Sequence, residues 1–184
     1  MVALLAVPVS PAAADPGRPA IAEIRTELSD GVLTASFRLV DSLDAETLER
    51  IHSGIPVTFK HRLDLVGARR YWLGSRKLYG RVRVETRVEY DPLLKRYTLW
   101  RRVETGDHEG GQAPEERLTA EESRMRSFLT VVEALALTEP GTELPVGKLK
   151  LRIHSNLGRR YVMMIFPASV SISAERQFEL DGTP

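Results

Sequence analysis

Strict alternation of apolar and charged residues is the feature that most constrains this fold. From residue 81 to residue 90 every second side chain is Val, Thr or Tyr, and the side chains between them are Arg or Glu. Successive side chains of a β-strand point to opposite faces, so the pattern predicts a half-buried strand with one charged face. Residues 57–65 repeat it with His61 on the apolar side, and residues 97–103 begin an antiparallel partner.

Further strands are predicted on both sides of this region. Residues 24–28 and 33–39 alternate around Asp30 and Gly31, which predicts a hairpin. Residues 149–153 alternate again, and residues 161–166 form an apolar run short enough for a buried strand that ends at Pro167. Residues 170–180 predict a final edge strand.

Two segments have helical spacing instead. Residues 41–54 carry Asp and Ser as N-cap candidates and Gly54 as a C-cap, which predicts one short helix. Thr119 and Glu122 have the spacing of a capping box, and apolar residues then recur at helical intervals, which predicts a longer helix over residues 119–138 before Pro140. Residues 104–118 are polar and rich in glycine, and predict a mobile loop.

Together these elements predict the fold class. We expect a mainly β chain with seven or eight strands, joined antiparallel by short connections. The expected architecture is an antiparallel β-sandwich, immunoglobulin-like in general shape, with one short and one longer helix. A single β-sandwich domain should span residues 15–184, a length that supports one sizeable core.

The first fourteen residues predict a signal peptide. An apolar run over residues 2–9 precedes three alanines, which offer an A-x-A cleavage site ahead of Asp15. The run is far shorter than the roughly 20 residues of a membrane span, and it lacks the usual positive start. The alternative is a packed or disordered N-terminal arm. From the predicted signal peptide we expect an extracytoplasmic protein, in the periplasm or cell envelope. The chain has no cysteine, which excludes disulfides and thiolate chemistry.

Charge is distributed unevenly along the chain. Residues 60–102 hold 13 Lys or Arg against four Asp or Glu, although the whole chain has a formal net charge of only +1. This predicts a basic sheet face with two interpretations: a solvated surface whose arginines pair with Glu85 and Glu89, or a binding surface on which aromatic residues interleave with arginines. Export disfavours nucleic acid, so the expected partner is an envelope protein or an anionic envelope component. The predicted binding residues are Arg62, Arg69, Arg70, Tyr71, Trp72, Arg81, Arg83 and Arg87.

The sequence offers no common catalytic or metal-binding motif. It lacks a nucleophile elbow, a phosphate-binding loop, a dinucleotide-binding glycine pattern and an H-E-x-x-H zinc motif. The four histidines have no ligand spacing, and His61 is expected to be a core histidine with one hydrogen bond. We therefore expect a non-enzymatic protein without a cofactor or bound metal.

Four segments are similar to a known family. They are SGIPVTF at 53–59, RRYW at 69–72, the Arg- and Val-rich strand that ends at Tyr90, and KRYTL at 95–99. Over residues 22–155 the chain resembles the bacterial domain of unknown function 4390 family, whereas residues 156–170 depart from the ending expected of it. The resemblance implies an exported or membrane-anchored protein of unassigned activity. Since some members are encoded near a sensor histidine kinase, it also implies an accessory role in envelope signalling.

Three functions follow as expectations. The first is an exported non-enzymatic binding or accessory module that assists a membrane sensor kinase through its basic, aromatic sheet face. The second is a small enzyme that acts on an envelope polymer, with acids and a histidine gathered in a cleft beside residues 104–118. The third is a carrier that holds a hydrophobic ligand between the sheet and the helix at 119–138.

Overall fold

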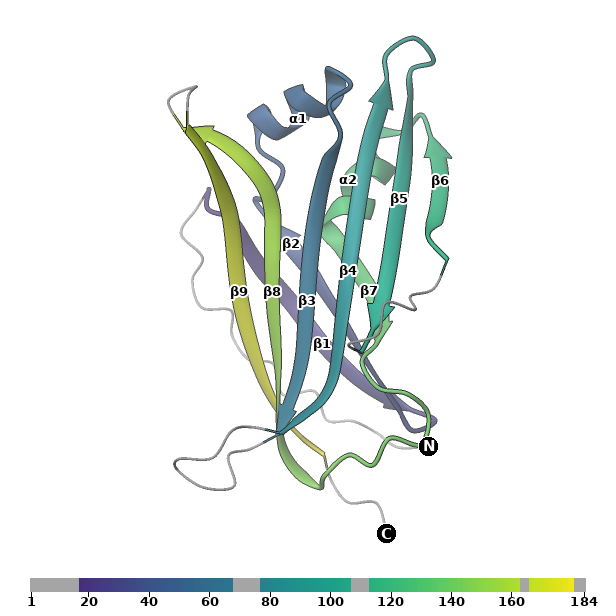
Figure 1. Cartoon of the computed structure of the whole chain (residues 1–184), viewed down its shortest axis with the longest axis vertical. Helices are drawn as coiled ribbons and strands as arrows, with labels where there is room; N and C mark the ends of the chain where they lie inside the picture. Colours follow the sequence, from purple (N-terminus) through teal and green to yellow (C-terminus); the bar gives the residue numbers. More distant parts are fainter. Residues whose placement is uncertain (1–16, 68–76, 107–112, 163–165, 181–184) are drawn as a thin grey trace.

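A computed structural model describes residues 17–67, 77–106, 113–162 and 166–180. Its strands form two antiparallel sheets, one of three strands in the order β1-β2-β7 and one of six in the order β6-β5-β4-β3-β8-β9. The long strands of the larger sheet face the viewer in Figure 1, and the smaller sheet crosses behind them. The expected mainly β, antiparallel sandwich is therefore confirmed, with nine strands among the described residues.

The larger sheet contains the alternating strands that dominate the sequence. It consists of β3 (Val57–Gly67), β4 (Leu78–Asp91), β5 (Arg96–Thr105), β6 (Glu115–Thr119), β8 (Gly147–Val162) and β9 (Phe166–Leu180). Alternation in β3 and β4 has the expected result, because every second residue is buried and those between them are more exposed. One face of this sheet therefore belongs to the core, and the other carries the charged side chains.

The smaller sheet is built on the predicted hairpin. Strands β1 (Ala20–Ser29) and β2 (Val32–Val40) pair antiparallel, and β7 (Val131–Ala136) lies on the other side of β2. Asp30 and Gly31 both have positive φ, at 50° and 76°, as the two central residues of a type I′ turn require. This turn keeps the right-handed twist of the two strands.

The first helix agrees with its sequence signals. In α1 (Ala45–His52), the Asp44 side chain accepts a hydrogen bond from the Thr47 backbone amide over 2.9 Å. Gly54 follows the helix with φ of +77°, a conformation that glycine adopts without steric cost. Ile51 is completely buried and packs α1 against the core.

The second helix differs from its prediction. Helix α2 (Glu122–Thr130) has nine residues, one more than α1, and the chain then enters β7 instead of remaining helical to residue 138. The predicted capping box is also wrong, since the N-cap is Glu121 without a side-chain bond, and Thr119 Oγ1 accepts from the Glu121 amide over 3.1 Å.

A bulge in β7 explains why its sequence resembles a helix. Ala35 pairs with Leu135 and Phe37 pairs with Val132, so three steps along β7 match two along β2. Ala134 has a positive φ of 47° at this point. Buried residues of β7 are therefore three positions apart, a helical interval, and they continue the spacing of Met125 and Leu129 in α2.

Two further predictions need correction. Residues 115–118 belong to the edge strand β6, which pairs with β5, so the predicted loop over residues 104–118 is too long; residues 107–112 lie outside the described part. Pro167 does not end a strand, because it lies inside β9 opposite Tyr161 of β8. The predicted final edge strand is confirmed as the C-terminal part of β9.

One core lies between the two sheets and receives side chains from both. Phe37 of β2, Phe59 and Leu63 of β3, and Leu151 of β8 are almost completely buried in it. Residues 1–14, the predicted signal peptide, lie outside the described residues, and the domain boundary at residue 15 stays a prediction.

Candidate functional site on the larger sheet

Charged side chains gather on the outer face of the six-stranded sheet. The strand register places His154 of β8 beside Arg62 of β3, Arg62 beside Arg83 of β4, and Arg83 beside Glu104 of β5. A parallel row of Asn156, Lys60, Glu85 and Arg102 lies directly next to it. Four neighbouring strands thus present two adjacent rows of polar groups on one surface.

These rows border a shallow groove of about 340 Å³, the charged groove of this protein. Four full cations and two carboxylates line it, a formal excess of two positive charges before any charge on histidine is counted. Its lining residues are Lys60, His61, Arg62, Arg83, Val84, Glu85, Arg102, Glu104, His154 and Asn156.

Ion pairs organise the cations along this face. Lys60 Nζ lies 3.3 Å from Glu85 Oε1, and Arg102 Nη1 lies 3.9 Å from Glu104 Oε1. Below the groove, Asp64 is shared, with its Oδ2 at 3.3 Å from Arg62 Nε and its Oδ1 at 2.7 Å from Arg81 Nε. Arg87 Nη2 lies 3.1 Å from Glu89 Oε2.

Arg87 pairs with Glu89 as predicted, although along one strand and not across two, and Glu85 is paired with Lys60. Such pairs are worth little stability at exposed positions. Within the described residues, the acids do not cancel the cationic excess of the groove. The cationic side chains of Lys60, Arg62 and Arg87 remain about half exposed or more, so a ligand can reach them. The outer face therefore combines ion-paired arginines, as a solvated surface would have, with accessible cations, as a binding surface would have.

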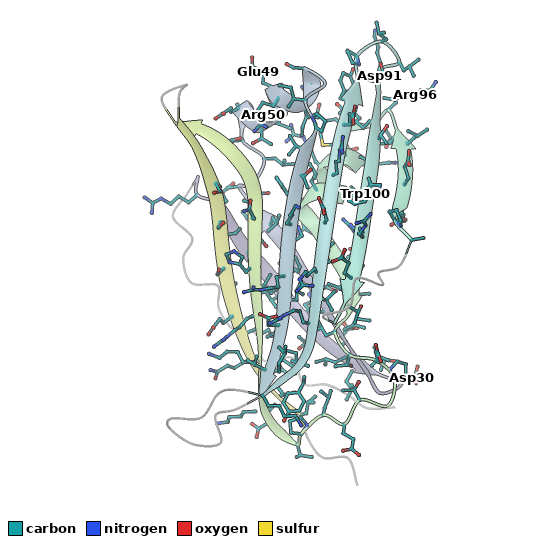
Figure 2. All side chains as sticks on the ribbon, in the orientation of Figure 1. Asp30, Glu49, Arg50, Asp91, Arg96 and Trp100 are labelled. Carbon is teal, nitrogen blue, oxygen red and sulfur yellow. The ribbon has the colours of Figure 1, made fainter. Side chains whose placement is uncertain are left out.

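A second hollow of about 240 Å³ continues the charged groove. The two share Glu85, and the second is lined mainly by Arg87, Glu89, Trp100 and Glu116. The Arg102 guanidinium lies 5.2 Å from the Trp100 ring centroid, a cation–π distance. Trp100 therefore supplies an aromatic surface next to the cations, and Figure 2 shows it on the viewer's side of β5.

The structure brings some of the predicted binding residues together and leaves others undescribed. Arg62, Arg81 and Arg83 lie on adjacent strand positions of the outer face, and Arg87 lies further along β4. The segment with Arg69, Arg70, Tyr71 and Trp72 is outside the described residues. Of the other aromatic residues, Tyr97 is buried in the core and Tyr79 packs partly against it, so neither interleaves with the arginines.

Sequence reasoning did not include Glu104 and His154 among the site residues. Each lies on the polar side of an alternating strand, which is a signal that the sequence does contain. The position of Glu104 next to Arg83 follows from the pairing of β4 with β5, whereas the position of His154 next to Arg62 depends on β8 pairing with β3, and 92 residues separate these two. Local patterns carry no information on such a pairing.

His61 is confirmed as a core histidine. It is only 2% exposed, its ring meets Phe37 edge to face at 5.3 Å, and its Nδ1 is hydrogen-bonded to Ser155 Oγ at 2.8 Å. Its Nε2 has no hydrogen-bond partner among the described residues. Burial lowers the pKa of His61 to about 4, and the nearby charge of Arg101 lowers it further in the same direction. The imidazole is therefore neutral at pH 7.

A second polar cluster joins the two helices at one end of the sheet. His52 Nε2 of α1 lies 3.0 Å from Tyr97 Oη and 3.5 Å from Glu122 Oε2 of α2. The rings of Tyr90 and Tyr97 are 4.7 Å apart. Burial raises the pKa of Tyr97, and the Glu122 carboxylate raises it further, so its hydroxyl stays protonated as a hydrogen-bonding group.

The described ranges hold neither a metal-ligating cluster nor a helix that could span a membrane. Within residues 17–67, 77–106, 113–162 and 166–180, no three His, Asp or Glu side chains are grouped so that they could hold a metal ion. In the same ranges, neither helix has the length and hydropathy needed to cross a bilayer.

The fold and this face define a mainly β protein of sandwich architecture, with a cation-rich groove on the outside of its larger sheet. A sequence model described as Domain of unknown function (DUF4390) matches residues 18–167, and the chain belongs to that family. The match extends beyond residue 155 and includes most of the segment expected to depart from the family. No curated protein and no solved structure matches the chain.

Proposed function

We propose that this protein is an exported, non-enzymatic binding module of the bacterial envelope that binds an acidic protein surface through the charged groove. One observation carries the proposal: two polar rows across four strands border a groove with an excess of cationic side chains. Cations spread over a solvent-accessible sheet face favour association with a surface of opposite charge and speed the encounter.

The mixed charges of the groove suggest selective recognition rather than general attraction of anions. Glu85 lies between Lys60 and Arg102 in one row, and Glu104 ends the other row beside Arg83, so a partner must match a mixed pattern of charge. Trp100 adds a rigid apolar contact beside the second hollow, of the kind that is enriched at protein interfaces. The resemblance to the family makes the extracytoplasmic part of a sensor kinase the first partner to test.

The proposal is tested by charge reversal in the native cells. A C-terminally tagged chain is crosslinked, the envelope is fractionated, and captured proteins are identified by mass spectrometry, with N-terminal sequencing of the tagged chain. We expect the groove variant Arg62→Glu/Arg83→Glu/Arg87→Glu, which changes two residues of the charged groove and one of the adjoining second hollow, to lose at least tenfold in capture of the partner. The matched control, Arg25→Glu/Arg117→Glu/Arg124→Glu, changes charge equally at exposed positions outside the groove.

Unchanged capture by the groove variant, with both variants folded by circular dichroism, contradicts the proposal. Capture of an anionic polymer instead of a protein, lost in the same variant, would assign the groove to an envelope component. An uncleaved protein recovered in the cytosol with RNA would contradict export.

The enzyme alternative keeps one specific observation in its favour. The charged groove is lined by the carboxylates of Glu85 and Glu104 and by the imidazole of His154, which come from three different strands. Purified protein incubated with isolated envelope polymer should then release fragments, and Glu104→Gln or His154→Gln should stop the release. The carrier function is not proposed, because completely buried Met125 and Leu129 pack α2 into the core.

A further inference from the structure

The turn between β4 and β5 exposes two large apolar side chains. Leu93 is 92% exposed and Leu94 is 61% exposed, the first of them almost as open to water as in an unfolded chain. All residues from Pro92 to Arg96 are exposed. An adjacent apolar pair at the outermost point of a hairpin loses hydrophobic stabilisation unless something outside the chain covers it.

This turn, the leucine tip (residues 92–96), is held in one shape. Asp91 Oδ1 accepts hydrogen bonds from the backbone amides of Leu93 over 2.8 Å and of Leu94 over 3.0 Å. These two bonds fix the chain before the leucines, and the paired strands continue directly on both sides, Asp91 opposite Arg96. The leucines are therefore presented in a defined position, without the ordering cost that a mobile loop would have on binding.

Two cationic side chains lie next to the leucines at the same end of the molecule. Lys95 and Arg96 follow directly in the sequence, and both are exposed. Figure 2 shows Glu49 and Arg50 of α1 at the same end of the molecule as Asp91 and Arg96. Ile55 adds a third exposed apolar side chain, next to Gly54, which lies against Tyr90 and Pro92.

We propose that the leucine tip docks on the surface of an anionic phospholipid bilayer. In this arrangement Leu93 and Leu94 enter the boundary between head groups and acyl chains, while Lys95 and Arg96 contact the phosphates. Apolar side chains flanked by Lys and Arg are the chemistry that peripheral membrane segments use. A convex point matches the deformable surface of a bilayer, whereas a protein partner would need a pocket shaped to receive it.

The proposal goes beyond the function assigned to the groove and does not depend on it. The strands of the larger sheet run along the longest axis of the molecule, and the leucine tip lies at one end of that axis (Figure 1). If the molecule contacts the membrane at this end, the outer face of the sheet points sideways, parallel to the membrane plane. The charged groove on that face is then open to a neighbouring protein.

The first test measures binding to vesicles. The full chain is sedimented with vesicles of roughly one part phosphatidylglycerol to three parts phosphatidylcholine, and with vesicles of phosphatidylcholine alone. We expect Leu93→Ser/Leu94→Ser to bind the anionic vesicles at least tenfold more weakly, and Lys95→Gln/Arg96→Gln to lose the preference for anionic lipid. Leu28→Ser/Val146→Ser is the matched control, since both residues are exposed apolar positions outside the leucine tip.

The second test reads the leucine tip directly, whatever other part of the chain touches the lipid. The sequence has no cysteine, so Leu93→Cys gives a single site for an environment-sensitive dye, and Val146→Cys, at a position 74% exposed, gives the control site. Anionic vesicles should shift the emission of the dye at residue 93 to the blue and leave residue 146 unchanged. No shift at residue 93, equal binding by the leucine variant, or burial of residue 93 only when a protein is added, overturns the proposal.

Discussion

His61 couples the stability of the core to pH. Its pKa is about 4 in the fold, below the value of 6.5 in an unfolded chain, because the buried site disfavours its charged form. The unfolded chain therefore binds the proton first, and the fold loses stability as pH falls from 6.5 toward 4. The full shift corresponds to roughly 3 kcal/mol. We expect His61→Gln to remove most of this pH dependence in urea denaturation at pH 7 and pH 4.5.

Carboxylates also titrate in this range, but they are the same in both proteins, so the difference between the two pH profiles isolates the histidine. Gln retains a polar group that can reach Ser155, the partner of His61. Parallel profiles for the two proteins would show that His61 keeps its ordinary pKa in the fold, and would contradict the buried, neutral imidazole.

Gly80 is required where β4 lies against the chain that leaves β7. A Cβ at this position would lie 2.1 Å from the backbone oxygen of Leu137, directly after β7, and the Leu137 amide is itself bonded to Leu33 O at 2.8 Å. Gly80→Ala must push β4 away from β7, and we expect a loss of about 3 kcal/mol or more in the free energy of unfolding. Gly106→Ala, with open space around it and φ of +79°, measures conformational strain alone and should cost about 1 kcal/mol.

Among the elements, Arg101 is the residue that joins α2 to the larger sheet. It lies on the inner side of β5, and its Nη2 donates to Phe128 O over 2.5 Å and to Val131 O over 3.2 Å, where α2 gives way to β7. Its guanidinium also lies 4.3 Å from the Phe128 ring centroid. These carbonyls are the ones that a helix C-terminus leaves without partners, and a cation there is favourable.

Removing this guanidinium should destabilise the fold. We expect Arg101→Leu to reduce the free energy of unfolding by about 2–4 kcal/mol, because two partly buried carbonyls lose a charged donor. Arg101→Lys should recover only part of the loss, since a single ammonium cannot reproduce the planar set of N–H donors of a guanidinium. Arg102→Leu, one position along on the exposed face, is the control and should change stability by less than about 0.5 kcal/mol in the same denaturation experiment. Equal effects at the two positions would contradict this role.

The elements also show how far local sequence determines this fold. Strands with one buried face, such as β3 and β4, follow directly from their alternation, and α1 follows from Asp44 and Gly54. The strand β7 could not be recognised, because its bulge gives buried residues a helical spacing and joins them without a break to α2. A local pattern predicts an element correctly only when that element keeps its regular period.

At the scale of the whole molecule, the candidate site was only partly predictable. The alternation of side chains along β3 and β4 places Arg62 and Arg83 on one face of the sheet, and the sequence contains that information. Glu104 enters the groove through the predicted antiparallel pairing of β4 with β5, but His154 enters it only through the pairing of β8 with β3, which is determined by long-range packing. The leucine tip is unpredictable for a different reason. The antiparallel strands over residues 81–90 and 97–103 imply a turn between them, but the exposure of Leu93 depends on the absence of any described element packed over it.

The charged groove and the leucine tip should act independently. A strand rises about 3.3 Å per residue, so Arg83 lies roughly 30 Å and Arg87 roughly 20 Å from Leu93, three times and twice the screening length near 10 Å in 0.1 M salt. Charge reversal at Arg62, Arg83 and Arg87 should therefore change vesicle binding by less than about twofold. Conversely, Leu93→Ser/Leu94→Ser should leave capture of the partner unchanged in detergent extracts.

In intact membranes the two surfaces should reinforce each other. A chain held at the bilayer meets a membrane-bound partner at a raised effective concentration, which increases capture without any new contact. Leu93→Ser/Leu94→Ser is therefore expected to reduce crosslinking about tenfold in intact envelopes but not after solubilisation, while the groove variant loses capture in both. Equal loss in both preparations would show that the leucines contact the partner itself, and would transfer the leucine tip from the membrane to the protein interface.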